Sequence, residues 1–418
     1  MVSVKFARGW SLWAAVAAAS CVSINPAFAQ PATLASTFRE AATSNPTIRA
    51  RQNDLQAAGF DLDGAKWGRY PSFSAQASTE LGGARTVLWL EQPLWTGGRI
   101  TGRISSATAG QAEAEAAVSA AQQEILQQTA SAFFDILRLE SRLKTAEANE
   151  SEHQRLLETI GRRVQAEVSP MTDQTQAAAR TQQAISDVIQ TRRLLESARS
   201  LLHELVGRPV PQVVAPSRID VRLSSEAAAL EAALAFSPER KRLLAQIDVA
   251  QAEIEVARAQ LMPQVVAGYV RNVGKLQLGE DRGRAFVGLQ AQTGAGLSSL
   301  SAVQAAQARR FSASDKIASY DRQLAQQVRA NWTDLQSLGA QLEPVRALLK
   351  GSDELVASYL RQFQVGRKNW LDVLNAQREK TQAYYSLADI ESPLALAKIR
   401  LMLLTGQLNA QNLDQIHD

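Results

Sequence analysis

The pattern of apolar and polar positions changes period several times along the chain, and each change predicts a new structural element. Residues 33–66 read as helix with a break at Asn45-Pro46, since proline is tolerated early in a helix. Residues 71–81 alternate between the two faces of a strand, Gly82-Gly83 is a turn signal, and residues 86–94 form a second strand candidate. The chain is therefore expected to begin with a broken helix and a β-hairpin.

A seven-residue repeat follows, from about Arg99 to Val164, in a segment without proline. One heptad series consists of Val118, Ile125, Ala132, Leu139, Ala146, His153 and Ile160. A repeat of this kind predicts a supercoiled helix, roughly 100 Å long at 1.5 Å per residue. After Pro170, residues 171–206 predict a return helix that ends at Gly207-Arg208-Pro209.

The second half of the chain repeats this pattern. Ser237-Pro238 matches Asn45-Pro46 at an offset of 192 residues, and Asp372 matches Asp173 at an offset of 199. Two constant offsets indicate a duplication with a seven-residue insertion, which falls between Pro263 and about residue 291.

The repeat predicts the elements of the second half by position. Strands are expected at residues 265–273 and 285–291, a long helix at 304–363 and a return helix at 370–405. Pro344 and Pro393 interrupt only this second hairpin, which predicts that it alone carries bends.

The N-terminus has the composition of a secretory signal peptide. Basic residues precede an apolar run at residues 10–22, and Ala27-Phe28-Ala29 provides the cleavage site. The sequence predicts a signal peptide at 1–29, a first repeat at 30–209, a linker at 210–222, a second repeat at 223–408 and a tail at 409–418. Cys21, the single cysteine, would be removed with the signal peptide, and its lipidation stays open.

Composition narrows the class of protein. Hydrophobic residues make up 45%, much of it alanine, and aromatic residues 6%, which suits close-packed helices. The net charge of +4 is small and well mixed, so no nucleic-acid partner is predicted. His153, His203 and His417 are far apart, and no catalytic set, metal site or cofactor site is predicted.

Beyond residue 29 no run of 18 apolar residues occurs, so a membrane could be crossed only by strands. Four strands cannot close a barrel, whereas three copies would supply 12 strands. Trp67, Tyr70 and Trp95 flank the strands and are expected at the lipid–water interface. Packing at a helix–strand corner is the alternative for these aromatic residues.

Two motifs carry a resemblance to a known family. The first is Gln92-Pro93-Leu94-Trp95-Thr96-Gly97-Gly98-Arg99, and the second runs from Phe363 to Gln377 through Asp372-Val373-Leu374-Asn375-Ala376-Gln377. With these motifs, in both repeats, the chain resembles the TolC-like outer membrane factor family. Residues 369–379 are most similar to members that serve type I secretion of large adhesins.

The resemblance implies a mainly α fold with a small β part. Long coiled-coil hairpins would form an α-barrel, and four strands per chain would contribute to a trimeric 12-stranded transmembrane β-barrel. The implied location is the cell outer membrane, extending into the periplasm. The implied function is a passive exit duct for type I protein secretion or drug efflux, with cargo left open. The implied partners are two further copies, a periplasmic adaptor (membrane fusion protein), an inner-membrane ABC or proton-driven transporter, and outer membrane lipid.

The resemblance also implies a periplasmic gate at the helix tips. By position, Asp372 matches a pore-lining aspartate, Lys368 a basic lock residue and Asp173 its acidic partner. Phe363 and Asn375 depart from the tyrosine and second aspartate of the family, which predicts a gate with fewer hydrogen bonds and weaker cation selectivity. Asp372 could instead act only as an acidic residue at a helix N-terminus.

Adaptor docking is implied at the turns themselves, and Gly366 and Trp370 are expected to shape and pack the second turn. The candidate docking residues are Ala166, Glu167, Val168, Ser169, Val365, Gly366 and Arg367. The alternative function is a soluble periplasmic coiled-coil adaptor or scaffold. That alternative explains the hairpins but not the repeated strand pairs, and no lipoyl-like β-domain separates the helices.

Overall fold

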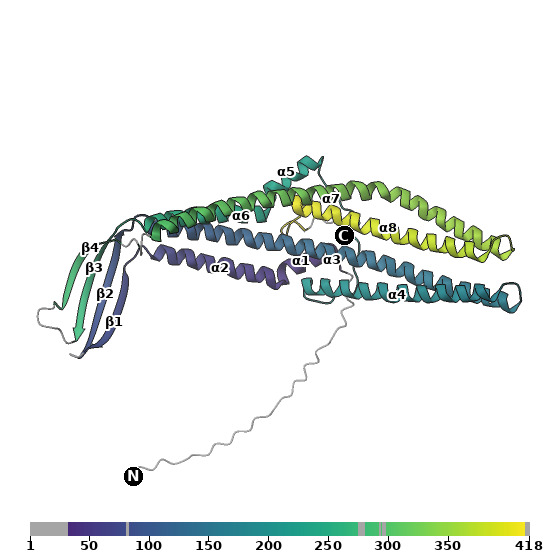
Figure 1. The fold of residues 1–418 in the computed structure, drawn as a ribbon, viewed down its shortest axis with the longest axis horizontal. Coiled ribbons are helices and arrows are strands. Elements are labelled where there is room, and N and C mark those ends of the chain that lie inside the picture. Colours follow the sequence, from purple (N-terminus) through teal and green to yellow (C-terminus); the bar gives the residue numbers. More distant parts are fainter. Residues whose placement is uncertain (1–31, 81–82, 275–280, 292–293, 295–297, 414–418) are drawn as a thin grey trace, which may run out of the picture.

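The computed structural model describes residues 32–80, 83–274, 281–291, 294 and 298–413. The predicted signal peptide, with Cys21, lies outside the described residues. The molecule is elongated, with a β-sheet at one end and the turns of two long helical hairpins at the other (Figure 1).

The two halves of the chain have the same order of elements. The first half consists of α1 (Leu34–Ser44), α2 (Pro46–Trp67), β1 (Ser72–Glu80), β2 (Gly83–Trp95), α3 (Arg99–Gln165) and α4 (Met171–Val206). The second consists of α5 (Glu226–Phe236), α6 (Pro238–Ala259), β3 (Gln264–Gly274), β4 (Gly283–Gln290), α7 (Ser298–Gln364) and α8 (Trp370–Thr405).

Corresponding helices have equal lengths in the two halves. They contain 11, 22, 67 and 36 residues in order. α7 begins at Ser298, six residues before the predicted start and 199 residues after Arg99, where α3 begins. Near this start, Val303 packs against Ile254 and Ala257 of α6. Both prolines of the second hairpin, Pro344 and Pro393, lie inside helices that continue past them.

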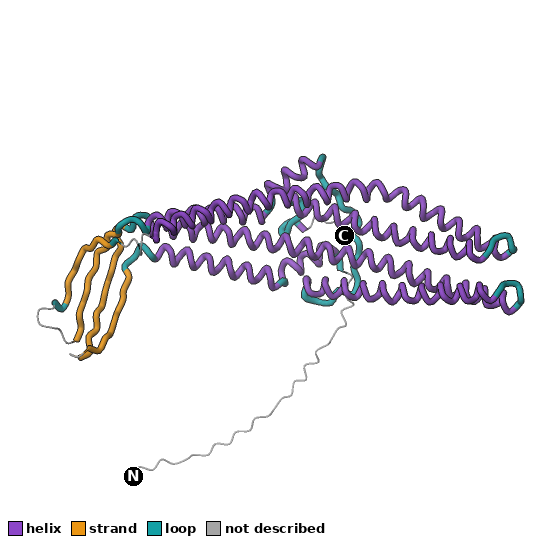
Figure 2. Tube along the Cα trace, viewed as in Figure 1, coloured by secondary structure: helices purple, strands orange, loops and turns teal. Residues whose placement is uncertain are grey.

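The four strands form one antiparallel sheet in the order β1-β2-β3-β4 (Figure 2). β2 pairs with β3 across the two repeats, with Leu90 opposite Tyr269. The register shifts between Pro93 and Trp95, where proline has no N–H to donate to the ladder. β1 and β4 are the two edges, so each has one side without a neighbouring strand in this sheet.

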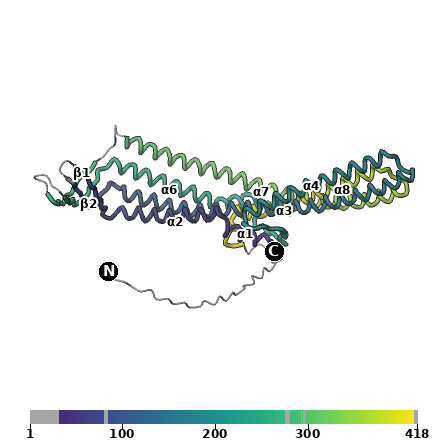
Figure 3. The backbone as a smooth tube through the Cα atoms, turned by 90° about the horizontal axis from the view of Figure 1, so that it is seen from below, coloured from purple at the N-terminus to yellow at the C-terminus, as the bar shows by residue number. Residues whose placement is uncertain are grey.

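The helices form a layer that runs away from the sheet (Figures 1 and 3). α3 packs on α2 and α6 in the half near the sheet and on α4 and α8 in the half near the tips. α7 packs on α6 and then on α8. α7 therefore lies along one edge of this layer, and α2 followed by α4 lies along the other, as β4 and β1 are the edges of the sheet (Figure 1).

The main apolar core lies midway along the molecule. There α1, α3, α4 and α8 bury a cluster that includes Phe38, Phe133 and Phe134. The rings of Phe133 and Phe134 meet edge to face, with centroids 5.6 Å apart. Large buried side chains from several helices thus meet midway along the molecule.

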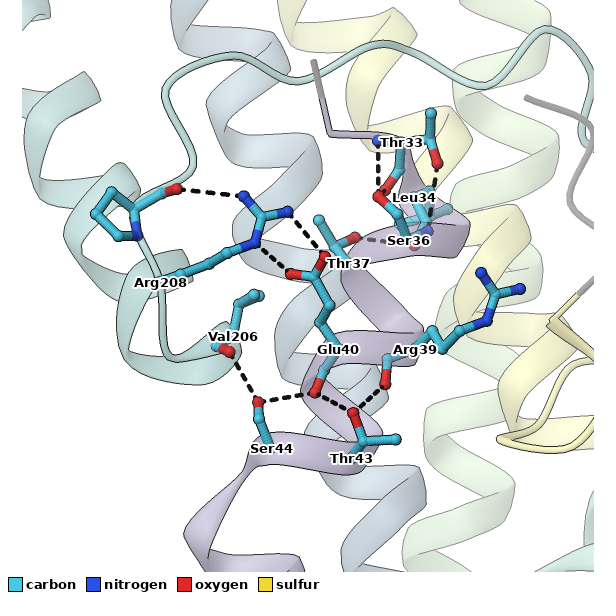
Figure 4. A network of polar contacts seen from close by, with 11 residues as sticks. Thr33, Leu34, Ser36, Thr37, Arg39, Glu40, Thr43, Ser44, Val206 and Arg208 are labelled. Carbon is cyan, nitrogen blue, oxygen red and sulfur yellow. Dashed lines mark hydrogen bonds and ion pairs between the residues drawn. The ribbon is translucent and has the colours of Figure 1, made fainter. Parts of the chain in front are cut away.

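The short helix α1 covers the C-terminal end of α4 (Figure 4). Ser44 Oγ donates a hydrogen bond to the Val206 carbonyl at 2.8 Å, and Asn45 Nδ2 donates to the Leu205 carbonyl at 3.2 Å. Arg208 forms a two-bond ion pair with Glu40, with N–O distances of 2.7 and 2.8 Å. Carbonyl groups that end a helix lack partners inside it, so α1 supplies those partners.

Candidate gating site at the helix tips

The two helical hairpins end in turns with the same backbone geometry. In the first, Glu167 N–H donates to the Val164 carbonyl and Val168 N–H to the Arg163 carbonyl, at 3.0 and 2.9 Å. In the second, the corresponding bonds join Gly366 to Phe363 and Arg367 to Gln362, at 3.1 and 2.9 Å. This pair of bonds defines a Schellman motif, which needs a left-handed residue after the helix. The second turn supplies glycine there and the first supplies glutamate.

The return helices begin differently after these turns. Asn369 caps α8, since its Oδ1 accepts a hydrogen bond from the Asp372 N–H at 2.9 Å. Pro170 precedes α4 and makes no side-chain cap. Asp173 and Asp372 each lie in the first turn of a return helix, where a negative charge is favoured by the helix dipole.

An apolar cluster joins the two hairpins just above the turns, and we call it the tip cluster. It consists of the buried residues Leu156, Ile160, Ala177, Phe363, Trp370, Val373 and Leu374, from all four helices. The Phe363 and Trp370 rings are 5.6 Å apart. Trp370 therefore packs the turn, and Phe363 is buried beside it; the role of Phe363 at the gate stays a prediction.

Arg163 connects the first turn to the tip cluster. Its guanidinium carbon lies 4.7 Å from the centroid of the Phe363 ring, and its Nε donates to Ser169 Oγ at 3.3 Å. The cation is thus placed over an aromatic face of the other hairpin while it holds its own turn.

Lys368 contacts residues of its own hairpin. Its Nζ lies 3.5 Å from Asp372 Oδ2, four residues further along the chain, and 4.4 Å from the centroid of the Tyr359 ring. Among the described residues of one chain, Lys368 makes no ion pair with Asp173. The lock between these two residues stays a prediction for the assembled protein. Asp173 and Asn375 are both partly exposed.

The predicted docking residues form the outermost surface of the tips. Val168 and Val365 are 62% and 69% exposed, and the nearby Met171 and Leu371 are also exposed. Large apolar side chains at the end of a molecule are candidates for contact with another protein. Adaptor docking at this surface stays a prediction.

A ladder of polar contacts continues above the tip cluster, between α3 and α8. Asn149 Oδ1 accepts hydrogen bonds from Gln377 Nε2 and Thr381 Oγ1, at 3.3 and 2.8 Å. Further along, Asp389 pairs with Arg138 and Arg142 at 3.3 and 2.6 Å. The sequence pattern does not predict this ladder. Its one local signal is an aspartate between Ala388 and Ile390 in a mainly apolar helix.

His153 lies inside the first hairpin. It is buried, and its carbonyl accepts a hydrogen bond from Thr181 Oγ1 at 3.3 Å. Burial lowers the pKa of the imidazole, and the positive charge of Arg180 lowers it further. The neutral form is therefore favoured, as expected for a packed histidine of the heptad series.

At the opposite end, Trp67, Tyr70 and Trp95 are all exposed beside the sheet. The rings of Trp67 and Tyr70 are 5.2 Å apart. Their position at a lipid–water interface stays a prediction. Within the described ranges, no helix is long and apolar enough to cross a membrane. In the same ranges, no group of three or more His, Cys, Asp or Glu side chains could hold a metal ion.

Solved structures share this arrangement of a small sheet joined to long paired hairpins. The crystal structure of the Campylobacter jejuni CmeC outer membrane channel superposes with a TM-score of 0.79, covering 91% of this chain and 88% of that one, at 13% identity. The family model for outer membrane efflux proteins matches residues 37–208 and again 229–407. The chain belongs to this family.

Two relatives are named for different roles. The cobalt-zinc-cadmium resistance protein CzcC of Cupriavidus metallidurans is 26% identical over 370 residues, which cover 85% of each chain. The alkaline protease secretion protein AprF of Pseudomonas aeruginosa is 25% identical over 312 residues, which cover 70% of this chain and 64% of the relative.

Family membership identifies the protein as an export channel of the outer membrane that extends into the periplasm. It decides against the soluble scaffold alternative. The family is one of outer membrane efflux proteins, and similar solved structures are outer membrane channels, which is consistent with the prediction of a protein that is not an enzyme.

Proposed function

We propose that three copies of this chain form a closed, passive exit duct. The observation that carries the proposal is the pair of open edges: β1 and β4 in the sheet, α4 and α7 in the helical layer. A strand edge has unpaired N–H and C=O groups, which are not tolerated in lipid. Pairing β4 of one copy with β1 of the next satisfies them, and three copies give a barrel of 12 strands.

The helix tips are the periplasmic entrance of this duct. Lys368, Asp372 and Asp173 provide the charged groups there, and the tip cluster holds the two turns of each chain together. A single exposed ion pair contributes about 0–1 kcal/mol, so a charged contact at the tips biases the closed state only as part of a ring. Docking of a periplasmic adaptor to the exposed turn residues, together with its inner-membrane transporter, opens the entrance.

The energy for export comes from the transporter, and the duct follows its choice of cargo. Type I protein secretion, including of a large adhesin, is the first candidate, supported by the similarity to AprF and by residues 369–379. Export of divalent metal cations is the second, favoured by the longer match to CzcC. Drug efflux is the remaining alternative.

Two experiments test the proposal. Outer membranes are isolated and treated with an amine-reactive cross-linker; bands of two and three copies are expected, whereas a monomer in the soluble fraction would refute the duct. A deletion strain is then compared with its complemented parent for secreted proteins and for growth in cobalt, zinc, cadmium and drugs. Loss of one secreted protein supports type I secretion, and metal sensitivity alone supports the second candidate.

A further inference from the structure

The contact between α3 and α8 inside one chain has a counterpart that one chain cannot make. An offset of 199 residues relates α3 to α7 and α4 to α8, and the helices of each pair have equal lengths. The counterpart of the α3–α8 contact is therefore a contact between α7 and α4. These two helices are at opposite edges of the helical layer (Figure 1).

We infer that α7 of one copy packs on α4 of the next copy in the register with which α3 packs on α8. Leu348 then lies against Ala178 of the next copy, and Leu355 against Met171 of the next copy. The inference rests on the proposed trimer and adds to it the residues that form the seam between copies.

Exposure supports this register at the tips. Trp370 and Leu156 belong to the tip cluster and are 3% and 5% exposed. Their counterparts, Met171 and Leu355, are 66% and 36% exposed in one chain. Leu348 is also exposed, at 58%. These positions are apolar although one chain leaves them open, which is expected if the next copy covers them.

Polar residues that contact each other between α3 and α8 are replaced together at the corresponding positions of α7 and α4. Inside the chain Asn149 is hydrogen-bonded to Gln377 and Thr381. The counterparts of Asn149 and Gln377 are Leu348 and Ala178, and that of Thr381 is Gln182, which is exposed in one chain. A buried polar group opposite an apolar one would lack a partner, at a cost of about 1–3 kcal/mol. Replacing both partners avoids that cost, and such paired replacement is expected of positions that contact each other.

Two further contacts show the same paired replacement. Arg400 Nη2 donates to Ser131 Oγ at 3.0 Å, and the counterparts of these residues are Leu201 and Ala330. Asp389 pairs with Arg138 and Arg142, and all three counterparts are uncharged: Gln190, Ser337 and Gln341. The seam between copies is thus apolar and amide-lined, whereas the seam inside each chain is charged.

Near the sheet, the corresponding contacts are α3 with α6 inside one chain and α7 with α2 between copies. At corresponding positions each contact has one glycine, on α3 in the first and on α2 in the second. A Cβ on Gly102 of α3 would lie 2.9 Å from Val256 Cγ2 of α6, so the helices approach closely at this glycine. The counterpart of Gly102 is Ser301 on α7, at the offset of 199 residues, and the counterpart of Val256 is Gly64 on α2, at the offset of 192. A Cβ on Gly64 would meet nothing within 4 Å in one chain. A glycine on one of the two helices is retained, which is consistent with Ser301 of the next copy approaching Gly64.

Cysteine cross-linking in the outer membrane tests the register. In a background with Cys21→Ser, Leu348→Cys and Ala178→Cys are combined and treated with a short, flexible bis-methanethiosulfonate reagent. Bands of two and three copies are expected from the double variant and not from either single variant. Asn149→Cys with Gln377→Cys is the matched control, which should cross-link within one copy and change only the mobility of the monomer.

A register control uses Leu348→Cys with Ile185→Cys, which is two helical turns, roughly 10 Å, from Ala178. Cross-linking of this pair, with none at Ala178, would overturn the register. A band containing a protein of different mass at Leu348 would overturn the inference that a second copy covers this face. If amine cross-linking of the unmodified protein gives no trimer, the proposed function itself fails, so the two failures are distinguishable.

Discussion

Glu167 and Gly366 occupy the same position in the two tip turns, and both have a left-handed backbone, with φ of 59° and 75°. Residues that have a Cβ are disfavoured in this region, by roughly 1–2 kcal/mol relative to glycine. An added Cβ on Gly366 would meet nothing within 4 Å, so its requirement is conformational and not steric.

Replacing Glu167 by glycine is therefore expected to stabilise the first turn. The matched variant is Glu167→Ala, which also removes the carboxylate but keeps the Cβ. We expect Glu167→Gly to be more stable than Glu167→Ala by about 1 kcal/mol, measured by hydrogen exchange of the tip amides. Gly366→Ala should lose a similar amount. Equal protection in both Glu167 variants would show that the turn is not strained.

Removing the charged tip residues is expected to widen the entrance. Lys368→Ala combined with Asp173→Ala should raise single-channel conductance in planar bilayers, because the closed state loses its charged contacts. The matched control is Lys66→Ala with Asp63→Ala, which removes an exposed ion pair of 3.0 Å on α2, far from the tips. Unchanged conductance in the tip variant would be evidence against a lock.

Trp370→Ala is expected to detach the two hairpins at the tips. Loss of a buried tryptophan costs about 3–5 kcal/mol, and this one contacts Phe363 across the turn. In the described part of the chain the Trp370 indole N–H has no hydrogen-bond partner. Trp370→Phe should therefore cost much less than Trp370→Ala. Limited proteolysis of the turns measures both, and equal cleavage rates would contradict the packing role.

Asp389→Asn is expected to weaken the contact between α3 and α8. The change keeps the shape of the side chain and removes the charge that faces Arg138 and Arg142. All three side chains are partly exposed, so we expect a loss of about 1 kcal/mol in the free energy of unfolding. The loss should shrink at high salt, because mobile ions screen the contact. A loss independent of salt would point to packing instead.

His153 predicts a pH dependence of stability. Burial and Arg180 lower its pKa in the folded protein, so the unfolded chain binds more protons below the unfolded pKa of about 6.5. Stability is therefore present above that pH and is lost as the pH falls below it. Thermal unfolding from pH 8 to pH 5 measures the loss, and His153→Gln should reduce it. The same slope in the variant would assign the effect to other groups.

The boundaries of the helices could be predicted where glycine and proline mark them. The break between α1 and α2 and both ends of α4 and α8 agree with the pattern, because Asn45-Pro46, Pro170 and the terminal glycines Gly207 and Gly406 restrict the backbone locally. The start of α7 was predicted six residues late, although the offset of 199 residues from Arg99, the start of α3, leads to Ser298.

The candidate site could be predicted in its location but not in its contacts. The pairing of Lys368 with Asp372 follows a four-residue spacing on the chain, which is a signal that the sequence contains. The pairing of Asp389 with Arg138 and Arg142 joins residues about 250 positions apart, and no local pattern selects one such partner. Burial of Phe363 likewise depends on Arg163 and Trp370 from other helices.

The equal lengths of the helices have a mechanical consequence. With 67 residues in both long helices and 36 in both return helices, the two turns end at the same distance from the sheet. In the proposed trimer all six turns would therefore lie in one plane. Shortening both hairpins by whole heptads would lower that plane evenly, whereas shortening one would leave half of the turns out of reach of any protein that meets them.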